Sequence, residues 1–306
     1  MRSLSRRLAR LSANEMVTAL GLHSGPAWLR AGLGLPFYAA SRQLGEILAE
    51  LDDAIGQRGL PLAAGRALER FGVALVTGGA PLAPGPQLVL ANHPGAYDAL
   101  GLVSALGRAD LKILAADRSF LRALPQLSTR LLFVGDQPGA RASALKRALR
   151  HLRQGNALLH FPAGQIEPDA DFEHTGRPLL AAWQPGVNAL VAACARANGR
   201  VAVAGVRGVH SPRAKRWRLN RWAERRGVTT LAPLLQMVAG LHDVGMQVRA
   251  VDVGDARSLQ GLAPDAQQAQ LRAALTQAIA AASAAPTPTP VDYSEIAEAS
   301  RTPSLR

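Results

Sequence analysis

Short apolar segments recur along the chain from residue 87 to residue 253, and helical patterns separate them. An apolar run of about five residues without alternation is typical of a strand whose two faces are both covered. Strands that alternate with helices build sheets that are largely parallel. We therefore predict an α/β fold: a mainly parallel or mixed central sheet flanked by helices, with an N-terminal helical region. The expected strands are Gln87–Ala91, Leu111–Ala115, Leu131–Val134, Ala157–Phe161, Val201–Val206 and Gln247–Val253.

Composition divides the chain into three parts. Residues 1–76 repeat apolar residues at helical spacing and predict an N-terminal helical, membrane-proximal region. Residues 77–86 are rich in Gly and Pro and predict a connector, so the α/β domain is expected over residues 77–283. Residues 284–306 are rich in Ala, Pro and Thr and predict a disordered tail. Within the domain, helices are expected from about Tyr97 and over Arg141–Arg153, Val187–Ala197 and Pro264–Ala282.

Charge and cysteine content narrow the class of function. Lys and Arg total 35 against 22 Asp and Glu, and the net charge of +13 favours an anionic partner: a membrane surface, nucleic acid or an acidic small molecule. The single cysteine, Cys194, excludes an internal disulfide and a multi-cysteine metal site, and predicts a reducing compartment such as the cytoplasm. The sequence contains no Walker A loop, no G-x-S-x-G elbow and no H-E-x-x-H pair, and no metal is expected.

Membrane contact is expected at the surface only. The best apolar stretch, residues 227–242, is too short to span a bilayer and is interrupted by Pro and Gly, so no transmembrane helix is predicted. The basic N-terminus places Leu4, Leu8 and Leu11 on one face of a helix. Two interpretations stay open for this helix: a surface anchor, or the first helix of the fold with a solvated basic face.

His93 and Asp98 form an H-x-x-x-x-D pair directly after the first expected strand. Open α/β sheets bind ligands at the carboxyl ends of their strands. An Asp in the first turn of the following helix can reach back to the imidazole, fix its tautomer and raise its basicity. This pair is a candidate general base. The alternative is structural: Asn92 or His93 ends the strand, and Asp98 complements the helix dipole.

A second motif follows the expected strand 157–161 at Phe161–Gln165, the sequence FPAGQ. Pro and Gly directly after a strand place backbone N–H groups at the rim of the sheet, beside the first motif. Such groups can hold a developing oxyanion or a phosphate.

These two segments resemble the signature blocks of the lysophosphatidate (glycerolipid) acyltransferase superfamily. NHPGAYD is similar to its N-H-x4-D block and FPAGQ to its F-P-E-G-T block, over roughly residues 80–255. The resemblance implies that His93 is the general base on an acceptor hydroxyl, that Asp98 orients it, and that an acyl-CoA or acyl-carrier protein donates the acyl group without a cofactor. The residues of the two motifs expected in substrate binding are Asn92, Pro94, Gly95, Phe161, Pro162, Ala163, Gly164 and Gln165. Arg118, outside the motifs, is a candidate contact for the phosphates of the acyl donor, and the alternative is a surface residue at a helix end.

The chain departs from the family pattern at three positions. Ala163 replaces the Glu of the F-P-E-G block, and Ile166 and Asp136 stand where the family often has Arg. Those basic residues usually hold the acceptor's phosphate, so a 1-acylglycerol-3-phosphate-like acceptor would need other cations. The F-P-A-G form resembles that of ornithine-lipid acyltransferases, which implies a lyso-ornithine-like acceptor as the second possibility. A catalytically drifted, lipid-binding relative is the alternative function. Arg141, Arg177 and Arg207 are candidate replacements for the missing cations.

Residues 211–226 hold seven Lys or Arg, one Glu and two Trp. Arg beside Trp is typical of a membrane interface. A solvated loop and a nucleic-acid patch are the alternatives, and the lipid substrate favours an anionic membrane surface over nucleic acid. We therefore expect a peripheral protein at the inner face of the cell membrane. The expected patch residues are Arg213, Lys215, Arg216, Trp217, Arg218, Arg221 and Trp222.

Three further features are expected to be mainly structural. His160 precedes the second motif and is predicted to pack on the face of the sheet opposite Phe161. Cys194 is predicted to be a small core residue. The acidic residues between 167 and 173 are expected to be solvated or to contact a cationic headgroup.

Overall fold

The computed structural model describes residues 2–19, 27–79, 81–95, 97–135, 137–172, 177–218, 220, 236 and 239–282. The strands are β1 (Val73–Gly79), β2 (Gln87–Ala91), β3 (Lys112–Ala116), β4 (Leu131–Val134), β5 (Ala157–His160), β6 (Arg200–Arg207) and β7 (Val244–Asp255). The helices before β4 are α1 (Arg2–Ala19), α2 (Ala27–Arg58), α3 (Leu60–Arg70), α4 (Asp98–Leu106), α5 (Ser119–Arg122) and α6 (Pro125–Ser128). The later ones are α7 (Pro138–Arg153), α8 (Gly186–Arg196), α9 (Pro212–Arg216), α12 (Ala256–Gln260) and α13 (Pro264–Ala282).

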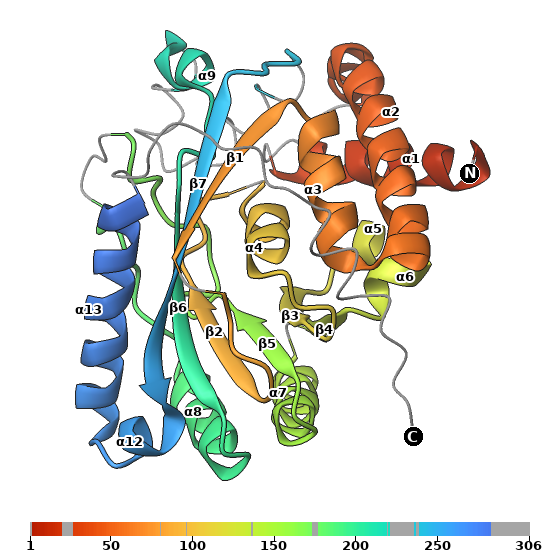
Figure 1. The fold of residues 1–306 in the computed structure, drawn as a ribbon. Coiled ribbons are helices and arrows are strands. Elements are labelled where there is room, and N and C mark those ends of the chain that lie inside the picture. The colour runs from red at the N-terminus through yellow and green to blue at the C-terminus, as the bar shows by residue number, and fades with distance from the viewer. Residues whose placement is uncertain are drawn as a thin grey trace.

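The described strands form one sheet in the order β1-β7-β6-β2-β5-β3-β4 (Figure 1). Every neighbouring pair is parallel except β6 and β7, which are antiparallel. Strands β1 and β7 therefore run opposite to the other five. The prediction of an α/β fold with a mixed, mainly parallel sheet between helices is confirmed.

Strand β2 lies at the centre of the sheet and is buried along its whole length. Its side chains alternate between two cores. Val89 and Ala91 belong to the core that contains residues of α2, α3 and α4, whereas Leu88 and Leu90 belong to the core formed with α7, α8 and α13. Two covered faces explain why the strand reads as an uninterrupted apolar run.

The N-terminal prediction is wrong at one point. Residues 73–76 belong to strand β1, which continues to Gly79, so the helical region ends at Arg70 and the connector begins after the strand. The strand pairs with β7 alone, and its side chains after Val73 are half-buried or exposed. The run of residues 73–76 is apolar, but only Phe71 and Gly72 separate it from α3, and it therefore reads as a continuation of the helical pattern. The expected tail, residues 284–306, lies outside the described residues.

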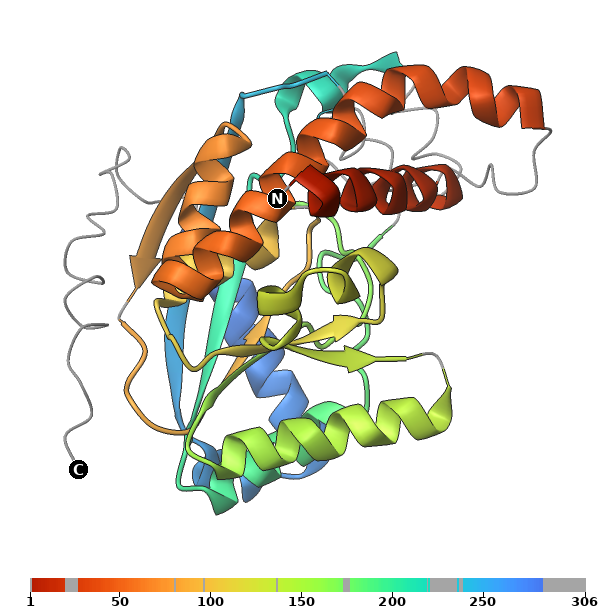
Figure 2. The same ribbon diagram turned by 90° about the vertical axis from the view of Figure 1, so that its right-hand side faces the viewer.

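Helix α1 packs against α2, and the two helices lie side by side at one end of the molecule (Figure 2). Leu8 is fully buried, and Leu4 and Leu11 pack against the same core. The helices approach closely because Gly45 has no side chain: a Cβ atom there would lie 2.5 Å from the Ser5 carbonyl oxygen. The apolar face of α1 is thus a part of the fold.

Within the described residues, no helix has the length and apolar character needed to cross a membrane.

Candidate active site

The two sequence motifs meet at one edge of the sheet. Strands β5 and β6 flank β2 on its two sides and run parallel to it, so their carboxyl ends share an edge. The described residues of the loops that leave this edge are 92–95 and 97 after β2, 161–166 after β5, and 208–211 after β6. This edge is where an open parallel sheet places ligands.

His93 and Asp98 form a close pair. The His93 Nδ1 atom lies 2.6 Å from Asp98 Oδ2, and Asp98 is almost fully buried whereas the His93 side chain is 30% exposed. The carboxylate also accepts the Gly95 N–H at 3.0 Å on Oδ2 and the Ala99 N–H at 2.6 Å on Oδ1. Asp98 is the first residue of α4, so the strand-to-helix turn brings its side chain back to the imidazole.

The environment of His93 favours its protonated form. Burial lowers its pKa, but the negative charge of Asp98, the hydrogen bond to Asp98 and the charge of Glu167 together raise the pKa above the ordinary value. The carboxylate fixes the tautomer with the proton on Nδ1, which leaves Nε2 as the acceptor. Among the described residues, none is hydrogen-bonded to Nε2. The pair can therefore take a proton from a bound hydroxyl.

The second motif lies against the first. The rings of His93 and Phe161 are 4.5 Å apart between centroids. The loop then turns tightly, with Gly164 N–H donating to the Phe161 carbonyl at 3.1 Å and Gly164 in the left-handed region at φ +65°. The Gln184 N–H holds the turn from outside by donating to the Pro162 carbonyl at 2.8 Å.

The expected substrate-binding residues divide by exposure. Gly164 and Gln165 are exposed at the edge of the sheet, as is Arg118, which ends the segment after β3 two strands away from β2. The others in the two motifs are buried: Asn92, Pro94, Gly95, Phe161, Pro162 and Ala163.

Asn92 joins two strand ends. Its side-chain N–H donates to the Val206 carbonyl at 2.8 Å, and its oxygen accepts the Val206 N–H at 2.8 Å. It is fully buried. The amide thus continues the pairing of β2 with β6 and positions the start of the loop that carries His93.

The acidic segment after the second motif is different from the expectation. Glu167 and Asp169 are both buried, so neither is solvated. Glu167 accepts the His93 N–H at 3.0 Å, and Asp169 accepts the Gly208 and Val209 N–H groups at 2.8 Å each. The sequence gives no signal for these contacts beyond the closeness of both residues to the motif.

The candidate cations are placed differently from one another. Arg177 is exposed and donates to the Ile166 carbonyl at 3.0 Å, whereas Arg207 forms an ion pair with Asp171. Arg141 is exposed in the second turn of α7. Asp136 lies outside the described residues.

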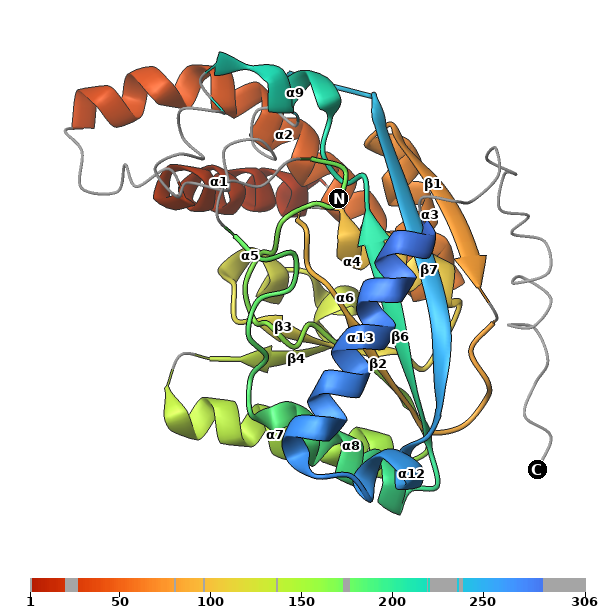
Figure 3. The ribbon, with the colours of Figure 1, turned by 90° about the vertical axis from the view of Figure 1, so that its left-hand side faces the viewer.

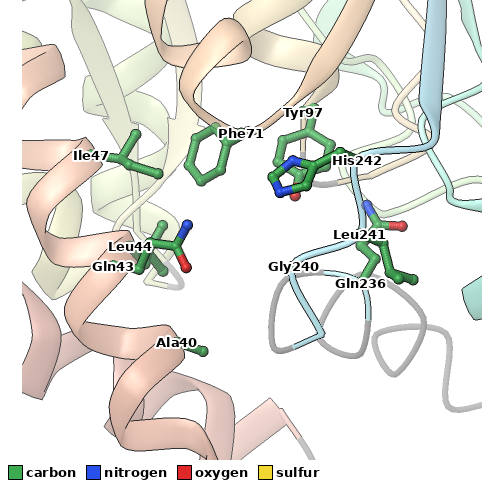
Figure 4. Close-up of a pocket in the computed structure, with 10 residues that line it drawn as sticks. All are labelled: Ala40, Gln43, Leu44, Ile47, Phe71, Tyr97, Gln236, Gly240, Leu241 and His242. Carbon is green, nitrogen blue, oxygen red and sulfur yellow. The ribbon is translucent and has the colours of Figure 1, made fainter.

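A small pocket borders the first motif at Tyr97 (Figure 4). Leu44 of α2 stands on one side, Gln236 and His242 on the other, and Phe71 and Tyr97 lie between them. The Tyr97 hydroxyl hydrogen-bonds to Gln236, and burial raises its pKa. The remaining lining residues are Ala40, Gln43, Ile47, Gly240 and Leu241.

Two other reactive side chains belong to a strand and a helix and not to the loops at this edge: His160 in β5 and Cys194 in α8. His160 lies on the sheet face opposite Phe161, and burial lowers its pKa to about 4. Cys194 is buried in α8, where burial raises its pKa to about 11. The described part of the chain contains no cluster of three or more His, Cys, Asp or Glu side chains that could hold a metal ion.

The expected basic patch is described in part. Trp217 is 39% exposed, and Arg213, Arg216 and Arg218 are exposed beside it. Lys215 lies over the ring of Phe172 at 5.3 Å. Arg221 and Trp222 lie outside the described residues. Figure 3 shows that α9, which holds much of this patch, lies at the same end of the molecule as α1 and α2.

Comparison with known proteins finds a distant structural likeness. No family model and no curated protein matches the chain. Among solved structures, the chain is similar to the 1-acyl-sn-glycerophosphate (LPA) acyltransferase PlsC from Thermotoga maritima, at 13% identity and a TM-score of 0.46. The match covers 94% of this chain and 100% of that one. A likeness at this identity and TM-score assigns no residue role and no substrate to this chain. The function proposed below therefore rests on the geometry of the site.

Proposed function

We propose that this protein is a peripheral membrane O-acyltransferase that moves a fatty acyl group from an acyl thioester to the hydroxyl of a lysolipid. The proposal rests on the His93–Asp98 pair, 2.6 Å apart where the parallel strands end, with the ring of Phe161 from the second motif 4.5 Å from the imidazole. A neutral His with a buried carboxylate on Nδ1 is a general base for a hydroxyl. The resemblance of the two motifs to the glycerolipid acyltransferases supports the acyl-transfer reading.

The proposed reaction needs no covalent enzyme intermediate. His93 Nε2 takes the proton of the acceptor hydroxyl as its oxygen attacks the thioester carbonyl. The tetrahedral intermediate collapses to the ester and a thiolate, and the His93 imidazolium returns the proton to the thiolate. Asp98 stabilises the imidazolium between these two steps. Cys194 takes no part because it is buried in α8 and its pKa is raised to about 11.

The acyl donor is proposed to be an acyl-CoA or an acyl-carrier protein, which acts as co-substrate, and no cofactor takes part. The acceptor is proposed to be a 1-acylglycerol-3-phosphate-like or lyso-ornithine-like lipid. Arg177 is exposed and donates a hydrogen bond to the Ile166 carbonyl, which lies next to the second motif. It is the candidate contact for an anionic headgroup in place of the Arg missing at position 166.

The membrane contact is proposed for the end of the molecule that carries α9. Exposed Arg and Trp side chains suit anionic headgroups and the interfacial region. A lysolipid acceptor would enter the site from this surface, and we place the protein at the inner face of the cell membrane. Nucleic acid is not an expected partner.

An acyl-transfer assay on purified protein tests the proposal. Labelled acyl-CoA and acyl-carrier protein would each be offered with lysophosphatidate, lysophosphatidylglycerol and lyso-ornithine lipid. Acylated product from at least one pair is expected, and the productive acceptor identifies the headgroup. Binding to lysolipid vesicles without product from any pair would contradict acyl transfer and favour the drifted, lipid-binding alternative.

A further inference from the structure

Glu167 holds both backbone polar groups of His93. Its side-chain Oε2 accepts the His93 N–H at 3.0 Å, and its own N–H donates to the His93 carbonyl at 2.7 Å. The residue is 3% exposed. The loop after β5 is thus hydrogen-bonded to the His93 backbone on both sides of the Cα atom.

The second oxygen of Glu167 reaches a third segment. Its Oε1 accepts the Ala181 N–H at 2.8 Å, and the Ala181 carbonyl accepts from Arg272 of α13 at 2.6 Å. Arg272 also donates to the Leu180 carbonyl at 3.1 Å. The carboxylate therefore sits between the loop after β2, its own loop and a segment that is fixed to α13.

We infer that Glu167 is a positioning residue for His93: it fixes the backbone of the general base and, as a buried anion, favours the imidazolium that forms during proton transfer. The catalytic part of this inference rests on the proposed function, whereas the hydrogen bonds between Glu167 and the His93 backbone do not depend on it. Two N–H donors, one on each oxygen, suit the ionised carboxylate, which accepts at both oxygens.

The electrostatics agree with this geometry. His93 faces two carboxylates, Asp98 at the start of α4 and Glu167 from the loop after β5. Glu167 faces His93 and Arg272. Burial raises the pKa of Glu167, while its two backbone hydrogen bonds and these two cations oppose that rise. The negative charge of Glu167 contributes to the raised pKa of His93.

Titration of the His93 ring by NMR tests the inference without any need for activity. Glu167→Gln removes the charge and leaves one acceptor for two N–H donors, so the pKa of His93 is expected to fall. Asp169→Asn is the matched control, because Asp169 is as buried, lies in the same loop and bonds to residues 208–210 instead of His93. The control is expected to leave the pKa of His93 in place.

Either of two results would overturn the inference: an unchanged His93 titration in Glu167→Gln, or an equal shift in Asp169→Asn. If Glu167→Gln does not fold, an NMR pH titration of the wild-type protein tests the contact instead. The amide protons of His93 and Ala181 should move together on acidification, at the pH where Glu167 takes a proton. Independent behaviour of these two amides would contradict the tether.

Steady-state kinetics distinguish a positioning role of Glu167 from a contribution to fold stability alone. Glu167→Gln is expected to lower kcat about tenfold to a hundredfold, the loss typical of a misplaced catalytic group, with KM within about twofold of wild type. The acid limb of its pH–rate profile should move to lower pH. Absence of turnover in the wild type would refute the proposed function alone, because the NMR titration tests the tether separately.

Discussion

His93 works through its environment as much as through its own ring. Its Nδ1 is bonded to Asp98, its backbone to Glu167, and its ring lies 4.5 Å from that of Phe161. A side chain constrained on so many sides loses little entropy when a substrate binds. The pair with Asp98 governs the pH range in which the base can act.

Asp98→Asn tests that pair. Asp98 raises the pKa of His93, so the acid limb of the wild-type pH–rate profile, where the rate rises as His93 loses its proton, should have its midpoint above pH 6.5, the ordinary histidine pKa. The amide removes the charge, so the limb should move to lower pH, and kcat should fall by about 10³-fold or more because the tautomer is no longer held. A pH–rate profile of wild type and variant measures both effects. A limb that stays in place would show that Asp98 does not control the base.

The sequence predicts this pair but not its surroundings. A five-residue spacing across a strand end and a helix start is a local pattern, and the structure realises it. Glu167 depends on a contact with a residue 74 positions earlier. Nothing in an acidic, Pro-containing loop distinguishes a buried carboxylate from a solvated one, so its role appears only once the two loops are seen together.

At the scale of elements, α1 and α2 depend on one close approach. Gly45→Val is expected to destabilise the fold by about 1–3 kcal/mol, because a Cβ would lie 2.5 Å from Ser5 O and 2.9 Å from Ala9 N. Gly56→Ala on the same helix is the control: its Cβ would meet only the flexible Gln126 side chain at 3.4 Å, and Ala favours a helix. Thermal unfolding measures both. Equal effects of the two substitutions would contradict this packing.

His160 of strand β5 should make the stability of the fold sensitive to acid. Its pKa is about 4 in the fold against 6.5 in the unfolded chain, so the unfolded chain binds the proton first. The stability contributed by this group is complete above pH 6.5 and is lost as the pH falls through 4, a loss on the order of 3 kcal/mol. His160→Leu should flatten that part of the stability curve in denaturant titrations. An unchanged slope would contradict the burial of the ring.

Most helices and strands of the domain are predicted from the sequence, but strand β1 is not. Central strands such as β2 are covered on both faces and therefore read as apolar runs. β1 pairs with β7 only and ends in Thr-Gly-Gly, which has the composition of a connector. Its apolar part, residues 73–76, follows α3 closely, and its pairing partner begins at Val244, far along the chain, so the sequence does not separate the strand from the helical region.

At the scale of the whole molecule, positive charge lies at two opposite ends. Figure 2 shows α9, α1 and α2 at one end and α7 at the other. Arg6, Arg7 and Arg10 of α1 are exposed, and α7 exposes Lys146, Arg150 and Arg153. If the end with α9 faces the membrane, charge on α7 should contribute little to binding.

Vesicle sedimentation can separate these two surfaces. Replacing Arg213, Arg216 and Arg218 together with Gln should weaken binding to anionic vesicles by about 1 kcal/mol per charge, and the loss should shrink in high salt. The control replaces Lys146, Arg150 and Arg153 with Gln, which changes the net charge equally. Equal losses from both variants would show a non-specific charge effect and contradict the assigned membrane surface.

The most direct test of the central claim is single-turnover acyl transfer by wild type and His93→Ala, with circular dichroism and thermal unfolding on the same samples. Removal of the imidazole deletes the base and leaves the His93 backbone contacts to Glu167 possible. We predict that the variant folds, binds lipid as the wild type does, and forms no product above background. A well-folded His93→Ala variant that transfers acyl groups at the wild-type rate would contradict the account.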